Sequence, residues 1–210
     1  PVAEESGLIN SIGLWVLRKA CCDALAWDDI TLSVNISAAQ LRNPEFPIQL
    51  GQILEETGFD PERLELEITE LVLLEESDGA FGILHQLRDL GIKIAMDDFG
   101  TGYSSLGYLR SFPFSTIKID QSFIRELEKG GKQGVLVRTI LTMAQSLGLK
   151  TVAEGIETAE IAAWLTELGC DEGQGYFWHR PMPAESLFEL IAGFLPQPSF
   201  LSAGADGSAC

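Results

Sequence analysis

The stretch of sequence that says most about the architecture of this chain is Leu64-Glu65-Leu66-Glu67-Ile68-Thr69-Glu70. Apolar and polar residues alternate along this stretch, which predicts a β-strand over 64–69 whose two faces have different surroundings. The same alternation recurs in Lys93–Asp97 and in Thr116–Ile119, and Asp120 follows the latter directly. Helices cover both faces of a doubly wound parallel sheet, so its strands would be continuous apolar runs. A strand with one polar face instead favours a barrel whose mouth is a wet, charged site.

Predicted helices alternate with predicted strands along the chain. The strands are one ending at Asn35, Leu64–Thr69, Lys93–Asp97, Thr116–Ile119, Lys150–Glu154 and a short one running toward Gln174. The helices are about Glu4–Ala26, Phe46–Thr57, Ser77–Leu90, Gln133–Leu147, one that Thr158 caps and Gly169 closes, and about Ala184–Phe194. This alternation demands a parallel sheet with helices outside it. An ordinary (β/α)8 barrel needs eight strands, so with six predicted strands either the sheet is open or the chain begins inside a barrel. The polar strand faces favour the barrel, and we expect an α/β fold of this kind.

Bulk properties narrow the class of protein. The 210 residues can bury the core of one domain, which we place at residues 1–195, with 196–210 as a disordered tail. A net charge of -17 argues against a long nucleic acid as partner, because no basic stripe offsets phosphate repulsion. No apolar run approaches the roughly 20 residues that span a bilayer, so we expect no membrane contact by this domain. The four cysteines form no C-x-x-C pair, which favours reduced thiols and a cytoplasmic location.

Carboxylates and one amide follow the predicted strands. Asp97 and Asp98 form the sharpest local signal, and Gly100 and Gly102 permit the backbone turn that would let both acids serve one site. So many acids at one edge would repel each other unless cations lie among them. Two metals bridged by one carboxylate form the clamp used for phosphoryl displacement. The alternative is a pair of helix-capping aspartates in a tight loop.

Four further residues extend this candidate site. Asn35 and Glu67 end neighbouring strands and offer the hard oxygen ligands that suit Mg²⁺ or Mn²⁺. Lys118 faces the same side, where it either balances charge as a buried ion pair or positions water or a phosphate oxygen. Glu154 is the best-placed candidate for a general base. The two histidines, His85 and His179, are too few for a zinc site or a nucleophile relay. The sequence also has no G-x-S-x-G elbow, which disfavours a serine hydrolase.

The chain resembles the EAL domains, bacterial phosphodiesterases that hydrolyse cyclic di-GMP. The matching segments, in family order, are Asn35–Ser37, Glu67–Glu70, Asp97–Leu106, Lys118–Asp120, Ala153–Thr158 and Gln174–Tyr176. This resemblance implies metal-dependent hydrolysis of one phosphodiester of cyclic di-GMP to linear pGpG, in bacterial second-messenger signalling. It also implies a modified (β/α)8 TIM-like barrel, with the first strands missing from this chain. Two Mg²⁺ or Mn²⁺ ions are implied as well, with Ca²⁺ expected to permit binding without turnover.

The resemblance assigns roles residue by residue. One metal would be held by Asn35, Glu67 and Asp97, and the other by Asp97 and Asp98. Glu154 would be the general base, and Lys118 would steer the attacking water. The supporting residues at the substrate site would be Glu70, Asp120, Glu157 and Gln174. The loop that couples the metal site to a homodimer contact would be Phe99, Gly100, Thr101, Gly102, Tyr103, Ser104 and Ser105, with Glu70 as its anchor.

One departure from the family pattern is serious. The Glu-Ala-Leu tripeptide that names the family, whose Glu is a metal ligand, is absent, and Asp23-Ala24-Leu25 lies on a predicted helix at the wrong place. We therefore expect a truncated domain that has little activity of its own. The complete protein would carry upstream sensory or diguanylate-cyclase-type domains and could be membrane-anchored. The alternative function is a catalytically impaired EAL domain that serves as a cyclic di-GMP receptor or regulatory dimer module. A different metal-dependent barrel enzyme, such as an enolase-type lyase, explains the acids but not the Asp97–Ser105 loop.

Overall fold

The computed structural model describes residues 2–27, 30–70, 72, 77–101, 109, 111–125, 127 and 131–194. The chain divides into two compact units, Pro1–His179 and Arg180–Cys210. The first unit contains the sheet, and the described part of the second contains one helix, α11 (Ala184–Phe194), with the bounds expected from the sequence. The domain boundary at residue 195 stays a prediction, and the tail at 196–210 lies outside the described residues.

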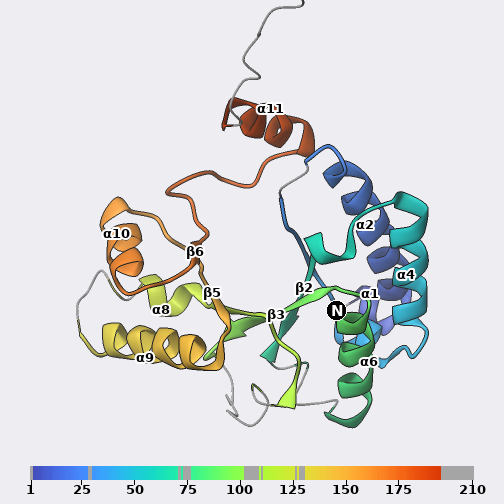
Figure 1. Cartoon of the computed structure of the whole chain (residues 1–210), viewed down its shortest axis with the longest axis horizontal. Coiled ribbons are helices and arrows are strands. Elements are labelled where there is room, and N and C mark those ends of the chain that lie inside the picture. The colour runs from blue at the N-terminus through green and yellow to red at the C-terminus, as the bar shows by residue number, and fades with distance from the viewer. Residues whose placement is uncertain are drawn as a thin grey trace, which may run out of the picture. The chain divides into compact units, whose positions relative to one another are not determined.

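Six parallel strands form the sheet of the first unit, and each strand pairs with the next along the chain. They are β1 (Leu32–Asn35), β2 (Leu64–Thr69), β3 (Lys93–Phe99), β4 (Thr116–Ile119), β5 (Lys150–Ala153) and β6 (Glu172–Gly173). The six strands and their parallel order were predicted from the alternation of elements. Two bounds differ, because β3 continues to Phe99 and β5 ends one residue before Glu154. Consecutive parallel pairing brings the carboxyl ends of all six strands to one edge (Figure 1).

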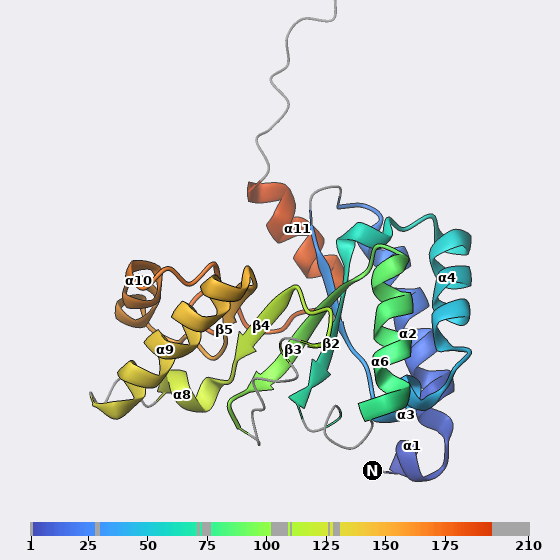
Figure 2. The ribbon, with the colours of Figure 1, turned by 60° about the horizontal axis from the view of Figure 1, so that its bottom comes forward.

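Helices follow the strands on the outside of the sheet (Figures 1 and 2). In the first unit they are α1 (Val2–Glu5), α2 (Leu8–Ala24), α3 (Ala38–Arg42), α4 (Phe46–Thr57), α6 (Ser77–Asp89), α8 (Gln121–Arg125), α9 (Lys132–Leu147) and α10 (Ala159–Glu167), with a 3₁₀ turn at Pro61–Arg63. The figures show α2, α4 and α6 together beside β1–β3, and α8, α9 and α10 beside β4 and β5. No helix in the described ranges is both long and apolar enough to cross a bilayer.

Two helical features near the N-terminus differ from the sequence-based expectation. The single helix expected over about 4–26 is broken into α1 and α2, because Gly7 has a left-handed φ of 73° that no helix interior accepts. The short helix α3 was not predicted. Its N-terminus carries a capping box, in which the Ser37 side chain accepts from the Gln40 backbone and the Gln40 side chain accepts from the Ser37 backbone.

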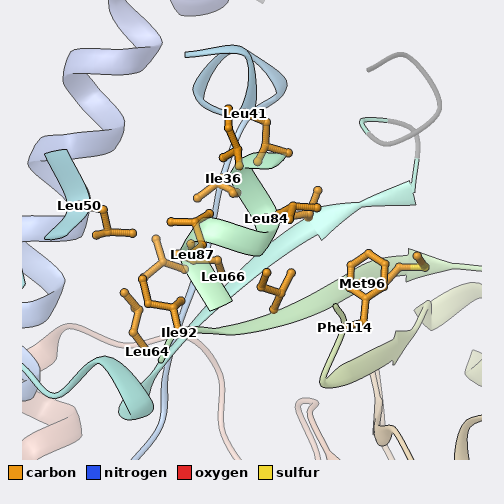
Figure 3. Packing of buried hydrophobic residues seen from close by; sticks show 14 of the residues in the cluster. Ile36, Leu41, Leu50, Leu64, Leu66, Leu84, Leu87, Ile92, Met96 and Phe114 are labelled. Carbon is orange, nitrogen blue, oxygen red and sulfur yellow. The ribbon is translucent and has the colours of Figure 1, made fainter. Parts of the chain in front are cut away.

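The alternation along β2 separates an apolar face from a polar one. Leu64, Leu66 and Ile68 are fully buried in the main hydrophobic cluster, which Figure 3 shows packed with residues of α4 and α6. The intervening Glu65 and Glu67 are buried too, on the opposite face. Burial of a carboxylate is costly unless other groups satisfy it. The polar face therefore needs partners from neighbouring strands.

Glu65 finds such partners toward the amino ends of the strands. Its Oε2 accepts a hydrogen bond of 2.6 Å from Thr116 Oγ1 on β4, and its Oε1 accepts one of 3.4 Å from Ser33 Oγ on β1. Thr116 is itself buried. These hydroxyls compensate the carboxylate within the sheet, so Glu65 contributes to the interior of the fold. Glu67, two residues later along β2, lies toward the carboxyl edge.

Candidate functional site

Lys118 is the centre of the polar cluster at the carboxyl edge of the sheet. Its Nζ lies 2.7 Å from Glu154 Oε1, 2.8 Å from Glu67 Oε2 and 3.3 Å from Asp97 Oδ1. These three carboxylates come from β2, from β3 and from the residue after β5, whereas Lys118 is on β4. Only 5% of Lys118 is exposed. One buried ammonium thus joins acids from three elements.

Asn35 reaches the same cluster from the first strand. Its Nδ2 donates a hydrogen bond of 3.0 Å to Glu67 Oε2, the oxygen that also faces Lys118. The two residues are direct partners in the β1–β2 register, so the parallel pairing itself sets this contact. With its amide nitrogen turned to Glu67, Asn35 keeps its carbonyl oxygen for another partner. Asn35, Glu67 and Asp97 therefore lie around one region, as their places at strand ends predicted.

A local irregularity in β3 places the two adjacent aspartates. Met96 pairs with Ile117 and Phe99 with Ile119, so both Asp97 and Asp98 stand opposite the single residue between those partners. Such a bulge turns side chains that would otherwise alternate between faces. Asp98 has a φ of 53°, and among the described residues it is the only non-glycine with a positive φ. Left-handed backbone at a non-glycine residue costs on the order of 1–3 kcal/mol and is concentrated at functional sites.

Hydrogen bonds hold the turn that follows this bulge. The Asp98 backbone N–H donates to Asp97 Oδ1 at 3.0 Å, and Thr101 Oγ1 donates to the Asp98 carbonyl oxygen at 2.9 Å. Gly100 adopts a φ of 96°, which its lack of a side chain permits. The predicted role of Gly100 as a turn residue agrees with this backbone.

The geometry brings Asp97, Asp98 and Glu154 together as possible cation ligands. One carboxylate oxygen from each of these residues lies within 4.8 Å of the others. Carboxylate oxygens are the ligands that Mg²⁺ and Mn²⁺ take in proteins. The donor set therefore fits a hard divalent ion. Glu67 lies beside this group through its shared contact with Lys118.

Proton affinities in the cluster reflect its excess of negative charge. Burial raises the pKa of Asp98, and the neighbouring carboxylates of Asp97 and Asp120 raise it further. Burial also raises the pKa of Glu154, although the hydrogen bond and charge of Lys118 oppose that change. For Lys118, burial lowers the pKa, but hydrogen bonds to Glu154 and Glu67 outweigh it, so the pKa lies above its usual value. The charged lysine alone does not neutralise the four acids Glu67, Asp97, Asp98 and Glu154. Bound divalent cations would offset the negative charge that remains.

The four residues with predicted supporting roles lie in different surroundings. Glu70 is buried one residue after β2. Asp120 follows β4, and its Oδ1 accepts a hydrogen bond of 2.9 Å from the Ser122 backbone. Glu157 is half exposed, with an Oε1 3.7 Å from Arg125 Nη2. The exposed Gln174 pairs through its backbone, donating to the Ala153 carbonyl and accepting from the Ile156 N–H.

The loop predicted to couple the metal site to a dimer contact is described only in part. Phe99 is buried at the end of β3, and Gly100 and Thr101 form the turn given above. The remaining residues lie outside the described part of the chain; they are Gly102, Tyr103, Ser104 and Ser105. The proposed role of this loop is therefore still a prediction.

Sequence reasoning missed the short helix α8, which begins directly after Asp120. Asp120 caps it through the bond to the Ser122 backbone, and the Asp120 carbonyl accepts from the Phe123 N–H. An aspartate directly after a strand is a preferred N-cap residue, and this signal could have identified the helix start. α8 also carries Arg125, the partner of Glu157.

Curated relatives cover nearly the whole chain. The chain is 41% identical over 197 residues to the bifunctional diguanylate cyclase/cyclic di-GMP phosphodiesterase MucR of Pseudomonas aeruginosa. It is also 41% identical over 186 residues to the cyclic di-GMP phosphodiesterase PdeR of Escherichia coli. These alignments include 91% and 87% of this chain but only 29% and 28% of the relatives. The chain thus spans less than a third of the length of either relative.

Solved structures share the fold. The MucR phosphodiesterase in complex with c-di-GMP matches 89% of this chain and 78% of its own, with a TM-score of 0.85 and 42% identity. A manganese/c-di-GMP complex of Klebsiella pneumoniae BlrP1 matches 82% of this chain and 45% of its own, with a TM-score of 0.76 and 30% identity. The six-stranded parallel sheet with outer helices corresponds to part of this modified TIM-like barrel, so the predicted fold class is confirmed.

A family model gives the assignment directly. The model for the EAL domain matches residues 1–181, which include every strand and every side chain of the cluster around Lys118. The match holds although this chain contains no Glu-Ala-Leu tripeptide. The chain therefore belongs to the EAL domain family.

Proposed function

We propose that this chain is the phosphodiesterase part of a protein that hydrolyses one phosphodiester of cyclic di-GMP to linear pGpG. The observation that carries the proposal is the convergence of Asp97, Asp98 and Glu154 around one edge of the sheet, next to the buried Lys118. Relatives with this domain, such as PdeR, are named cyclic di-GMP phosphodiesterases. A solved relative holds c-di-GMP itself.

Two divalent ions fit the donor set of this edge. Asn35, Glu67 and Asp97 would hold one, and Asp97 and Asp98 would hold the other. The manganese and calcium complexes of BlrP1 with c-di-GMP support a metal-dependent site. When bound, such ions supply Lewis-acid polarisation of a phosphoryl oxygen and favour the deprotonated form of water. We propose Mg²⁺ or Mn²⁺ for turnover, and Ca²⁺ for binding without turnover.

The chain's own acid and base groups suit proton transfer at this edge. Burial raises the pKa of Glu154 toward the range in which a carboxylate accepts a proton efficiently. Lys118 stays charged and donates to Glu154 Oε1 at 2.7 Å, so it fixes the direction of that carboxylate. In this proposal Glu154 takes the proton of the attacking water, and Lys118 orients the water and the phosphate. Asp120, Glu157, Glu70 and Gln174 support the surrounding loops.

The experiment is turnover of cyclic di-GMP by the full-length protein with Mn²⁺, followed by chromatography of the nucleotide products. The proposal expects pGpG to form, EDTA to stop its formation, and Glu154→Gln to abolish turnover while binding persists. Arg138→Gln, a change on the outer helix α9, is the control and should leave turnover unchanged. Cyclic di-GMP that stays intact in the presence of Mn²⁺ would refute the enzymatic proposal. If the nucleotide still bound tightly, the receptor function would take its place.

We also propose which domains accompany this one, how it associates and where it is located. Because the chain covers less than a third of MucR and of PdeR, we infer that sensory or diguanylate-cyclase-type domains accompany it in the complete protein. We also propose that the domain forms a homodimer through the region after Asp98. Three described cysteines are free thiols, which supports a cytoplasmic location. Size-exclusion chromatography with light scattering would test the homodimer.

A further inference from the structure

The bulge at Asp97 and Asp98 raises the question of what holds these residues in place. Regular pairing of β3 with β4 is interrupted between Met96 and Phe99. The backbone ladder therefore does not fix Asp98, whose left-handed φ of 53° needs support from elsewhere. The hydrogen bonds of Asp98 to Asp97 and Thr101 are internal to the same turn. Among the residues that the structure describes, a packing contact supports the turn from outside.

The helix α8 is well anchored beside this turn. Ile124 is fully buried in a second hydrophobic cluster, together with Ile119 of β4 and Ala153 of β5. Asp120 caps the helix directly after β4. α8 also contacts α9, and both figures show it beside β4 and β5 (Figures 1 and 2). The position of α8 is thus fixed to the strands that carry Lys118 and precede Glu154.

From this anchored position α8 contacts two glycine turns of the site. A methyl group at Gly100 would lie 2.9 Å from the Cε2 and Cζ atoms of Phe123. A methyl group at Gly155, the residue after Glu154, would lie 2.6 Å from Gln121 Cβ. Both glycines have positive φ, 96° and 71°. The Phe123 ring is therefore packed against the turn after β3, and the start of α8 against the turn after β5.

We propose that Phe123 is a positioning residue, whose ring holds the Gly100 turn so that Asp98 faces Asp97 and Glu154. This inference rests on the proposed function for its consequence, because the positioned residues are the proposed metal ligands. The contact itself is independent of any metal. Loss of the ring would let the turn at Gly100 relax, and the carboxylate of Asp98 would leave the group that it forms with Asp97 and Glu154. Residues that orient metal ligands typically change metal affinity about 10–100-fold when replaced.

The first test is Mn²⁺ binding to the full-length protein by isothermal titration, without nucleotide and well below the unfolding temperature. Phe123→Leu should weaken binding about tenfold, and Phe123→Ala more, because less of the ring's volume remains against Gly100. Leu168→Ala is the control, because Leu168 packs on the same hydrophobic cluster from the end of α10. It should change the affinity by less than about twofold. Unchanged affinity in Phe123→Leu, or equal weakening in Leu168→Ala, would overturn the proposal.

The second test needs no metal and separates this inference from the proposed function. In EDTA, Gly100→Ala should lower the midpoint of thermal unfolding, because its methyl group meets the ring and because φ is positive. In the Phe123→Leu background the same change should cost about 2–4 °C less, because the smaller side chain leaves room. Additive shifts would refute the contact. If Mn²⁺ bound the parent no better than Asp98→Asn, the metal site of the proposed function would fail, and the EDTA result would still decide the contact.

Discussion

Lys118 Nζ and Glu154 Oε1 lie 2.7 Å apart, at the ends of two neighbouring strands, and little solvent reaches the lysine. The same ammonium faces Glu67 and Asp97. The buried cation therefore has a structural effect that is separate from any part in the reaction. Without it, three carboxylates would face one another in a medium of low dielectric constant.

Lys118→Met should therefore destabilise the metal-free protein strongly. Breaking a buried ion pair from one side typically costs about 3–5 kcal/mol, because the partner charges stay buried. Unfolding in urea with EDTA measures the loss, and Mn²⁺ should recover part of it by supplying positive charge. The matched control is Lys150→Met, which removes an exposed lysine 3.5 Å from Glu172 and should cost less than about 1 kcal/mol. Equal effects of the two changes would contradict this account.

Thr116→Val should destabilise the fold from the opposite end of the sheet. The two side chains have the same shape, but valine cannot donate the 2.6 Å hydrogen bond to the buried Glu65 carboxylate. Removal of one partner from a buried charged acceptor costs about 1–3 kcal/mol. Chemical denaturation measures the change in the free energy of unfolding. Thr139→Val on the exposed face of α9 provides the comparison, and similar losses at both positions would show that Glu65 does not depend on Thr116.

Gly175→Ala should be among the most damaging small substitutions in the chain. A methyl group there would coincide with the carbonyl group of Ile156, closer than non-bonded atoms can approach. The Ile156 backbone pairs with Gln174 and Phe177, so the change would displace the segment after Glu154. We expect a loss of soluble protein, or a thermal midpoint lowered by more than about 5 °C. Gly82→Ala within α6 has open space, and should be neutral or stabilising by about 0.5–1 kcal/mol. A folded Gly175→Ala variant with an unchanged midpoint would refute the close approach.

Cys21 and Cys22 should differ in their reaction with iodoacetamide. Burial, together with a smaller effect of the neighbouring Cys22, raises the pKa of the Cys21 thiol to about 11, whereas Cys22 is exposed. The thiolate is the reactive form, so at pH 8 Cys22 should be alkylated first, as peptide mass spectrometry would show. Because the folded pKa is raised, the neutral Cys21 thiol stabilises the fold fully below about pH 9 and loses that effect toward about pH 11. Cys21→Ala should remove this decline, and equal alkylation rates would contradict the assignment.

Much of the fold followed from local patterns in the sequence. The strand Leu64–Thr69 and the helix Phe46–Thr57 have the bounds that were predicted, because alternation, helical periodicity and a glycine at the helix end all agree there. The break at Gly7 was missed, since an apolar helical pattern continues across it and only the backbone reveals the left-handed residue. Short helices such as α3 and α8 carry too few residues for a periodic signal, and only their capping residues indicate them.

For the candidate site too, some features could be predicted from the sequence and others only from the structure. Asn35, Glu67, Asp97 and Glu154 come together because parallel strands end at one edge, a rule that needs no coordinates. The bulge at Asp98 and the contact of Phe123 with Gly100 depend on how β3, β4 and α8 meet in space. No alternation of residue types encodes such a meeting. Likewise, the sequence left open whether Lys118 balances charge in a buried ion pair or positions water or a phosphate oxygen. The structure shows its contacts to Glu67, Asp97 and Glu154.

The extra residue in β3 makes the acid pair vulnerable to one kind of genetic change. Two residues of β3, Asp97 and Asp98, stand opposite a single residue of β4. Deletion of one codon there would restore an uninterrupted ladder and relieve the left-handed backbone of Asp98. We expect the shortened chain to keep the parallel sheet while losing one of the paired acids. The proposed metal site can thus be lost while the sheet remains, so the two residues between Met96 and Phe99 are the feature to compare in related chains.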